Sequence, residues 1–192
     1  MPNDMPASIK IPFERCREGA VVPHYVRDGD AGMDICAAED ADILPGQTVL
    51  VPTGLKFAIP RGYEMQIRPR SGISLRTALR IPNAPGTIDS GFRDEVGVIL
   101  TNMCLPVGSN TIESIMEIVD NADQYPRVGL DGAGSSAPSS AGPCIYEIKK
   151  GDRIAQIVIK AVPAAELFEV DDVGEYGGDR RGGFGSTGVN DC

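Results

Sequence analysis

Short apolar or alternating runs, separated by turn signals such as PG, RG and KGD, dominate the pattern along the chain. Runs of this kind are typical of antiparallel strands. Few segments have a helical period, and strands do not alternate with helices. The pattern predicts an all-β fold, either a sandwich, a jelly roll or a barrel. The predicted strands lie at residues 8–12, 21–26, 33–37, 48–52, 55–60, 63–69, 95–102, 145–150 and 153–162.

Residues 103–144 interrupt this pattern. Asn110 lies three residues before Glu113, which resembles a capping box and predicts the start of a short amphipathic helix. A tract rich in Gly, Ser, Ala and Pro follows at 129–143 and predicts a mobile loop. We interpret 103–144 as an insertion of a short helix and a loop. The apolar face of the helix is predicted to consist of Ile112, Ile115, Met116 and Val119, at positions i, i+3, i+4 and i+7.

Composition narrows the function classes. A chain of 192 residues that is 42% hydrophobic has enough apolar material for one domain. Its net charge of -9 argues against a nucleic-acid-binding surface, so an anionic ligand must meet a local arginine cluster.

No signal peptide or membrane span is evident, and we expect a cytoplasmic protein, or one of the host cytoplasm if the source is viral. Five scattered cysteines and one histidine argue against a disulfide framework and a zinc site.

Polar residues that could carry chemistry interrupt the apolar strands. Arginines, hydroxyl groups and glycine-rich backbone suit a triphosphate, and an aspartate can hold a hydrated Mg²⁺ or activate a water molecule. This combination predicts a nucleotide hydrolase without a P-loop, because no G-x-x-x-x-G-K-[ST] is present. The residues are Asp34, Arg68, Arg70, Ser71, Arg76, Asn83, Asp89, Arg153, Gln156, Arg180, Arg181, Ser186 and Thr187.

The tail contains GFGSTG, which has the glycine spacing of a dinucleotide-binding turn. Only four residues follow Gly188, so no helix can follow it as such a turn requires. We expect the tail to be a mobile arm that closes over a nucleotide, with Phe184 stacking on the base.

Five motifs, in order, resemble those of the trimeric dUTPase family: AGMDI, PRSG, NAPGTIDSGF, GDRIAQ and GGFGSTG. The resemblance covers residues 31–188 except the insertion. It implies a jelly-roll (β-clip) homotrimer with active sites between subunits, which hydrolyses dUTP to dUMP and pyrophosphate with Mg²⁺. It also implies a β domain at 1–176 and a phosphate-binding arm at 177–192.

The resemblance also implies residue roles. Asp34 would lie in the outer shell of Mg²⁺, and Asp89 would be the general base that orients water at the α-phosphorus. Phe92 stands where the family usually has a tyrosine beneath the deoxyribose, and Asp94 replaces a common glycine. Phosphate contacts would come from Arg70, Ser71, Gly72, Gln156, Gly185, Ser186, Thr187 and the arginine finger, either Arg180 or Arg181. Uracil contacts would come from Asn83, Gly86, Thr87, Ile88 and Phe184.

Two alternatives remain open at this point. The dCTP deaminase family shares the fold, and Ser71, Arg76 and residues 88–92 fit its pattern loosely; GDRIAQ and GGFGSTG favour dUTPase. A regulatory role is the second, in which the insertion 103–144 binds a protein partner. The helix of the insertion could equally dock on its own subunit. Neither a membrane nor a nucleic acid is an expected partner.

Overall fold

The computed structural model describes residues 8–104, 118–119, 121–130 and 143–178. The chain divides into two compact units, Met1–Val162 and Pro163–Cys192, a division that falls earlier than the predicted boundary after Tyr176. The second unit contains the 3-10 helix η2 (Val173–Glu175), and Phe168 meets Tyr176 edge to face at 6.0 Å between ring centroids. No helix among the described residues is long and apolar enough to cross a membrane.

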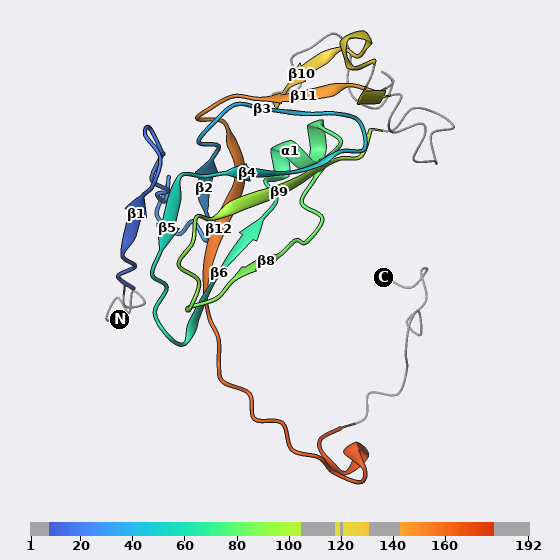
Figure 1. Ribbon diagram of the computed structural model, residues 1–192. Helices are drawn as coiled ribbons and strands as arrows, with labels where there is room; N and C mark the ends of the chain where they lie inside the picture. The colour runs from blue at the N-terminus through green and yellow to red at the C-terminus, as the bar shows by residue number, and fades with distance from the viewer. Residues whose placement is uncertain (1–7, 105–117, 120, 131–142, 179–192) are drawn as a thin grey trace. The chain divides into compact units, whose positions relative to one another are not determined.

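The first unit is built almost entirely of strands, as predicted (Figure 1). Seven of the nine predicted runs form strands at or close to their expected places. These are β2 (Met33–Cys36), β4 (Thr48–Pro52), β5 (Leu55–Phe57), β6 (Tyr63–Arg68), β9 (Gly97–Asn102), β11 (Ile145–Ile148) and β12 (Arg153–Ala161). The others are β1 (Phe13–Arg15), β3 (Ala41–Ile43), β7 (Leu79–Arg80), β8 (Gly86–Ile88) and β10 (Arg127–Gly129).

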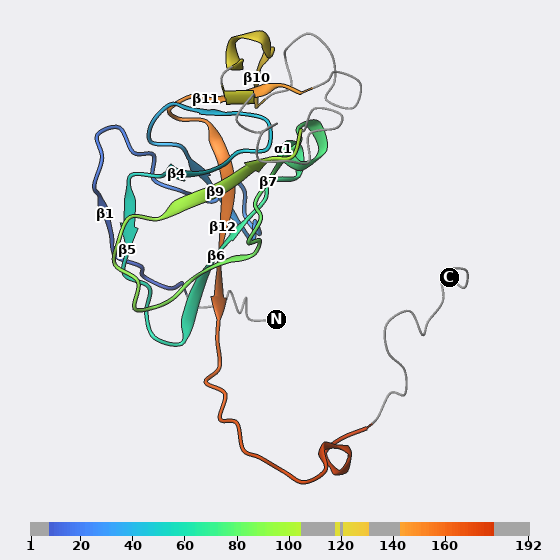
Figure 2. The ribbon, with the colours of Figure 1, turned by 45° about the vertical axis from the view of Figure 1, so that its right-hand side comes forward.

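Four small sheets make up this unit, with the orders β1-β5, β10-β11-β3, β2-β12-β6-β8 and β4-β9-β7. The long strand β12 crosses the middle of the unit in both Figure 1 and Figure 2, with β6 beside it. All the pairings between described strands are antiparallel except that of β10 with β11.

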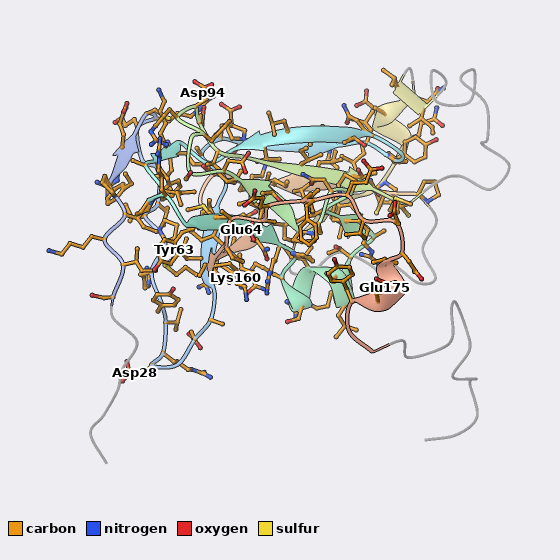
Figure 3. The ribbon with its side chains drawn as sticks, turned by 90° about the horizontal axis from the view of Figure 1, so that it is seen from below. Asp28, Tyr63, Glu64, Asp94, Lys160 and Glu175 are labelled. Carbon is orange, nitrogen blue, oxygen red and sulfur yellow. The ribbon has the colours of Figure 1, made fainter. Side chains whose placement is uncertain are left out.

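Strand alternation separates the core from the surface. Along β6, Met65 and Ile67 are buried and pair with Ile159 and Ile157 of β12. Glu64 and Gln66 alternate with them and face outward, and Figure 3 shows Glu64 of β6 close to Lys160 of β12, as the register requires. The polar residues of β6 and β12 therefore share one outer sheet face.

Two of the predicted strands are not found where they were expected. Residues 21–26 form no strand, and the run at 8–12 gives way to β1, which begins at Phe13. Pro23 lacks a backbone donor, which disfavours a paired strand there. The short helix α1 (Ser71–Arg76), which only Ile73 anchors in the core, was not predicted.

The described part of the insertion is more than a helix and a loop. Residues 118 and 119 are helical, but Ile118 is buried whereas Val119 is 58% exposed, so the prediction that Val119 lies on the apolar face is wrong. The apolar face runs through the preceding position instead. The segment continues through 3-10 helix η1 (Ala122–Gln124) into β10, which pairs with β11. Ile112, Ile115 and Met116 lie outside the described residues.

Candidate active site

An ion pair joins the first two motifs. Asp34 lies on β2, and Arg70 lies between the end of β6 and α1. Arg70 donates from Nε to Asp34 Oδ1 at 2.8 Å and from Nη2 to Oδ2 at 3.0 Å. The side chains are 28% and 26% exposed, so the pair is reachable from solvent. Because a guanidinium carries five N–H donors, Arg70 keeps donors for an anion while it holds Asp34.

Arg153 joins the same carboxylate. It donates from Nη1 to Asp34 Oδ2 at 3.2 Å, and its backbone carbonyl accepts from Arg70 Nη1 at 3.3 Å. In a regular strand Arg153 and Gln156 would face opposite sides. A register shift between Arg153 and Ala155 puts both residues on the face of Asp34, as a β-bulge does. The sequence placed Arg153 among the residues that could carry chemistry but gave it no role, because a bulge cannot be found from alternation alone.

Gln156 pairs with Asp34 across the strands and lies in one row with Arg68 of β6. Its Nε2 donates to the carbonyl of Pro69 at 2.8 Å, which fixes the amide beside Arg70. Gly32 makes room for it, because a Cβ there would lie 2.6 Å from Gln156 Oε1. Asp34, Arg70, Arg153 and Gln156 therefore form one polar cluster, called here the phosphate cluster, at the end of β6 where Ser71 and Gly72 begin α1.

The other predicted residues lie in the hairpin 83–92, at the far edge of the same sheet. The Asn83 amide lies over the buried Gly86, where a Cβ would be 3.2 Å from Asn83 Nδ2 and 3.4 Å from Ile67 Cβ. The Ala84–Pro85 peptide bond is cis. Asn83 and Thr87 are exposed, so a planar ligand can approach their edges.

A tight turn carries Asp89. The amide of Phe92 donates to the carbonyl of Asp89 at 3.1 Å, and Phe92 packs partly buried against the core while Asp89 is exposed. Arg93 stabilises this turn: its Nη1 donates to the carbonyls of Ser90 and Phe92, both at 2.7 Å. Sequence reasoning missed Arg93, whose contacts are made to backbone atoms of the turn.

Asp89 and the phosphate cluster are not neighbours within this chain. The sheet order β2-β12-β6-β8 puts three strand spacings, about 14 Å, between Asp34 and the hairpin edge. The two groups are also displaced along the strands. Asp34 lies level with Arg68 of β6, whereas Ile88 lies level with Met65, three residues or about 10 Å away. The structure thus divides the predicted residues into two groups on one sheet.

The donor set limits how a metal could bind. The described residues contain no group of three or more His, Cys, Asp and Glu side chains that could hold an ion. Asp34 is the only carboxylate in the phosphate cluster, and guanidinium groups engage both its oxygens. Such a site suits Mg²⁺ that keeps its water and is carried mainly by substrate phosphates.

Cys36 lies close to the phosphate cluster on β2. It is 7% exposed, and burial raises the pKa of its thiol, an effect that the positive charge of Arg153 opposes. The thiol therefore stays protonated near neutral pH. The predicted tail residues Arg180, Arg181, Phe184, Gly185, Ser186 and Thr187 lie outside the described residues.

Comparison with known proteins agrees with this geometry. The family model described as dUTPase matches residues 18–111. The deoxyuridine 5'-triphosphate nucleotidohydrolase of Zymomonas mobilis is 38% identical over 185 residues, covering 94% of this chain and 99% of that protein.

Solved structures agree as well. A variant of Staphylococcus bacteriophage 80alpha dUTPase with dUpNHpp has a TM-score of 0.74 at 27% identity, covering 95% of this chain and all of that one. That protein belongs to the phage dUTPases described as controlling transfer of virulence genes by a proto-oncogenic G protein-like mechanism. A variant dUTPase from phage phi11 of S. aureus, described with a structural Mg(II) ion, has a TM-score of 0.68 at 25% identity, covering 85% of this chain and 98% of that chain.

Proposed function

This chain belongs to the dUTPase family and is an enzyme that hydrolyses dUTP to dUMP, and from this premise we propose how its residues divide the reaction. The observation that carries the proposal is the division of one sheet into a phosphate cluster and a hairpin that bears Asp89. Each group has the chemistry for one end of a nucleoside triphosphate.

The phosphate cluster binds the triphosphate. Arg70 offers its remaining N–H donors to phosphate oxygens, and Ser71 and Gly72 add a hydroxyl and backbone donors. Gln156, which Pro69 holds in place, contacts the phosphate chain. Arg153 adds charge at the exposed side of Asp34. Ser186, Thr187, Gly185 and one of Arg180 and Arg181 complete the phosphate contacts from the tail.

The hairpin binds the nucleoside. Asn83 and the backbone of Gly86, Thr87 and Ile88 read the edge of uracil, because the close packing at Gly86 leaves little room for a methyl group. Phe92 supports the deoxyribose, and Phe184 stacks on the base.

Asp89 is the general base. Its exposed carboxylate, on a turn held by Arg93, accepts a proton from the water that attacks the α-phosphorus. The α-phosphorus–oxygen bond to the β-phosphate breaks, and pyrophosphate leaves with dUMP retained. Arginines neutralise the charge that develops on the leaving group.

Mg²⁺ fits this donor set as an ion held by the substrate phosphates. When bound, it neutralises phosphate charge, and Asp34 would hold it through water. The ion pairs with Arg70 and Arg153 orient the Asp34 carboxylate for that contact.

The active site is shared between subunits of a homotrimer. Asp34 and Asp89 of one chain are separated by on the order of 15–20 Å, too far to act on the same phosphorus. A symmetric assembly that sets the hairpin of one chain beside the phosphate cluster of another completes the site.

Asp89→Asn tests the base assignment. We expect turnover of dUTP to fall by about 10²–10⁴-fold, because a positioned base contributes that much, while a non-hydrolysable dUTP analogue still binds. Steady-state kinetics and calorimetry measure the two quantities. Activity above about a hundredth of the wild-type value would exclude Asp89 as the base.

A partner-binding role of the insertion 103–144 is the second proposal. It is supported by the phage dUTPase relative that is described as controlling virulence-gene transfer. The described end of the insertion docks on its own subunit through Ile118 and β10, which leaves Val119 exposed. A chain in which a short turn replaces 104–143 should keep dUTP hydrolysis and lose its partner from host lysate. Unchanged partner recovery would contradict this role.

A further inference from the structure

Two cysteines lie at the two ends of the insertion. Cys104 follows β9, and Cys144 comes directly before β11. The side chain of Asn102 joins their backbones: Oδ1 accepts from Cys104 N at 3.0 Å, and Nδ2 donates to Cys144 O at 2.8 Å. Asn102 is fully buried and also donates to the carbonyl of Ile43 at 3.0 Å. One buried amide therefore fixes both cysteines in the same place.

The two thiols lie close enough to influence each other's ionisation, and the hydroxyl of Tyr146 does the same to Cys144. That hydroxyl accepts from Ala78 N at 2.8 Å. Burial and the neighbouring Cys104 raise the pKa of the Cys144 thiol to about 11. Cys104 is only half-buried. An oxidant therefore reaches Cys104 first, and Cys144 lies nearby as a protonated thiol.

We propose that Cys104 and Cys144 form a reversible oxidation site, at which a peroxide converts the dithiol to a disulfide that closes residues 105–143 into a covalent loop. Cys104 Sγ attacks one peroxide oxygen, the O–O bond breaks, and a sulfenic acid and water form. Cys144 Sγ then attacks the Cys104 sulfur and the S–O bond of the sulfenic acid breaks. The departing hydroxyl takes the Cys144 proton and leaves as the second water molecule. The pair loses two electrons, and one hydrogen peroxide is reduced to two water molecules.

The fold needs little change to accommodate this bond. A disulfide requires Cβ atoms about 3.8 Å apart. The Asn102 amide already holds the backbones of Cys104 and Cys144 beside each other. The bond would join the end of β9, in the sheet β4-β9-β7, to the start of β11, in the sheet β10-β11-β3. Because it closes a loop of about 40 residues, it should raise the melting temperature by about 5–10 °C.

Peroxide treatment of the full-length protein tests the proposal. Peptide mapping without reductant should show one cross-linked pair carrying Cys104 and Cys144, about 2 Da lighter than the two thiols and lost on reduction. The melting temperature should rise and return with dithiothreitol. Cys16→Ser, a substitution at a half-buried cysteine elsewhere, is the matched control and should behave as the wild type.

Cys104→Ser should abolish both the cross-link and the shift in melting temperature. A shift that persists in Cys104→Ser, or oxidation of the wild type without this cross-link, would overturn the proposal. Because a substitution at buried Cys144 can disturb the fold, the reduced wild type is also tested with phenylarsine oxide, which bridges neighbouring thiols. It should protect Cys104 and Cys144 together from alkylation, and alkylation of both at the unprotected rate would equally overturn the site.

Discussion

The missing side chain at Gly32 controls where Gln156 lies. A Cβ at Gly32 would be 2.6 Å from Gln156 Oε1, but that atom ends a flexible side chain, so the fold can tolerate the change. We predict that Gly32→Ala displaces the amide from Pro69 O and raises KM for dUTP about tenfold. The melting temperature should change by less than about 3 °C. Steady-state kinetics and thermal unfolding measure the two effects.

A double-mutant cycle is the control for that prediction. If Gly32→Ala acts through Gln156, it should have less than about a twofold effect in a Gln156→Ala background. Fully additive effects on KM would show instead that Gly32 supports the site in another way.

At the same scale, the motifs identified most of the polar site residues but not their partners. Asp34, Arg70 and Gln156 were predicted, and the structure brings them together. Arg153 was among the candidate residues but without a role, because only the bulge in β12 turns it toward Asp34. Arg93 was not predicted, because its partners are backbone carbonyl groups, whose positions depend on how the turn folds.

Among the elements, Glu95 connects three segments. It accepts from Arg17 Nε at 2.7 Å and from the amide of Gly54 at 2.8 Å, in the turn between β4 and β5. The hydrogen bond from Arg17 lowers the pKa of Glu95 in the folded state. Its contribution to stability is therefore present above the unfolded value and is lost as pH falls through the folded pKa.

We predict that Glu95→Gln lowers the melting temperature by about 2–4 °C near pH 7. The difference from the wild type should shrink below about pH 4.5 and vanish once both states are protonated. Thermal unfolding between about pH 3 and 7 measures it. Glu39→Gln, which removes the more exposed Arg17–Glu39 pair, is the control and should change little. A difference independent of pH would contradict the role of the ionised carboxylate.

Element length decided which parts of the fold could be predicted. The long runs β6 and β9 bury alternate residues, and β12 buries adjacent apolar pairs on either side of Gln156, so all three were found from their apolar pattern. The strands β8 and β10 have three residues each, too few to show a period. Helix α1 has six residues, including serine and glycine, and one buried anchor, Ile73, so local preference does not indicate a helix. Its form depends on packing rather than on sequence pattern.

For the whole molecule, the spacing of Asp34 and Asp89 was invisible in the sequence, because it depends on strand order and register. β2 and β8 are the outer strands of one four-stranded sheet, with β12 and β6 between them. A chain with this order cannot complete the reaction with its own Asp34 and Asp89 together, which makes assembly a condition of activity under the proposed mechanism.

Mixing two inactive variants tests this shared site. Asp34→Asn removes the carboxylate of the phosphate cluster and leaves Asp89, whereas Asp89→Asn leaves the phosphate cluster. If each site takes these groups from different subunits, the purified mixed trimers should regain about a third of wild-type activity, because one site in three receives both intact residues in either mixed composition. Coexpression with two affinity tags isolates the mixed assemblies, and each variant alone gives the baseline. If each chain used its own pair, no site could contain both carboxylates and the mixture would stay at that baseline, even though the trimers had formed.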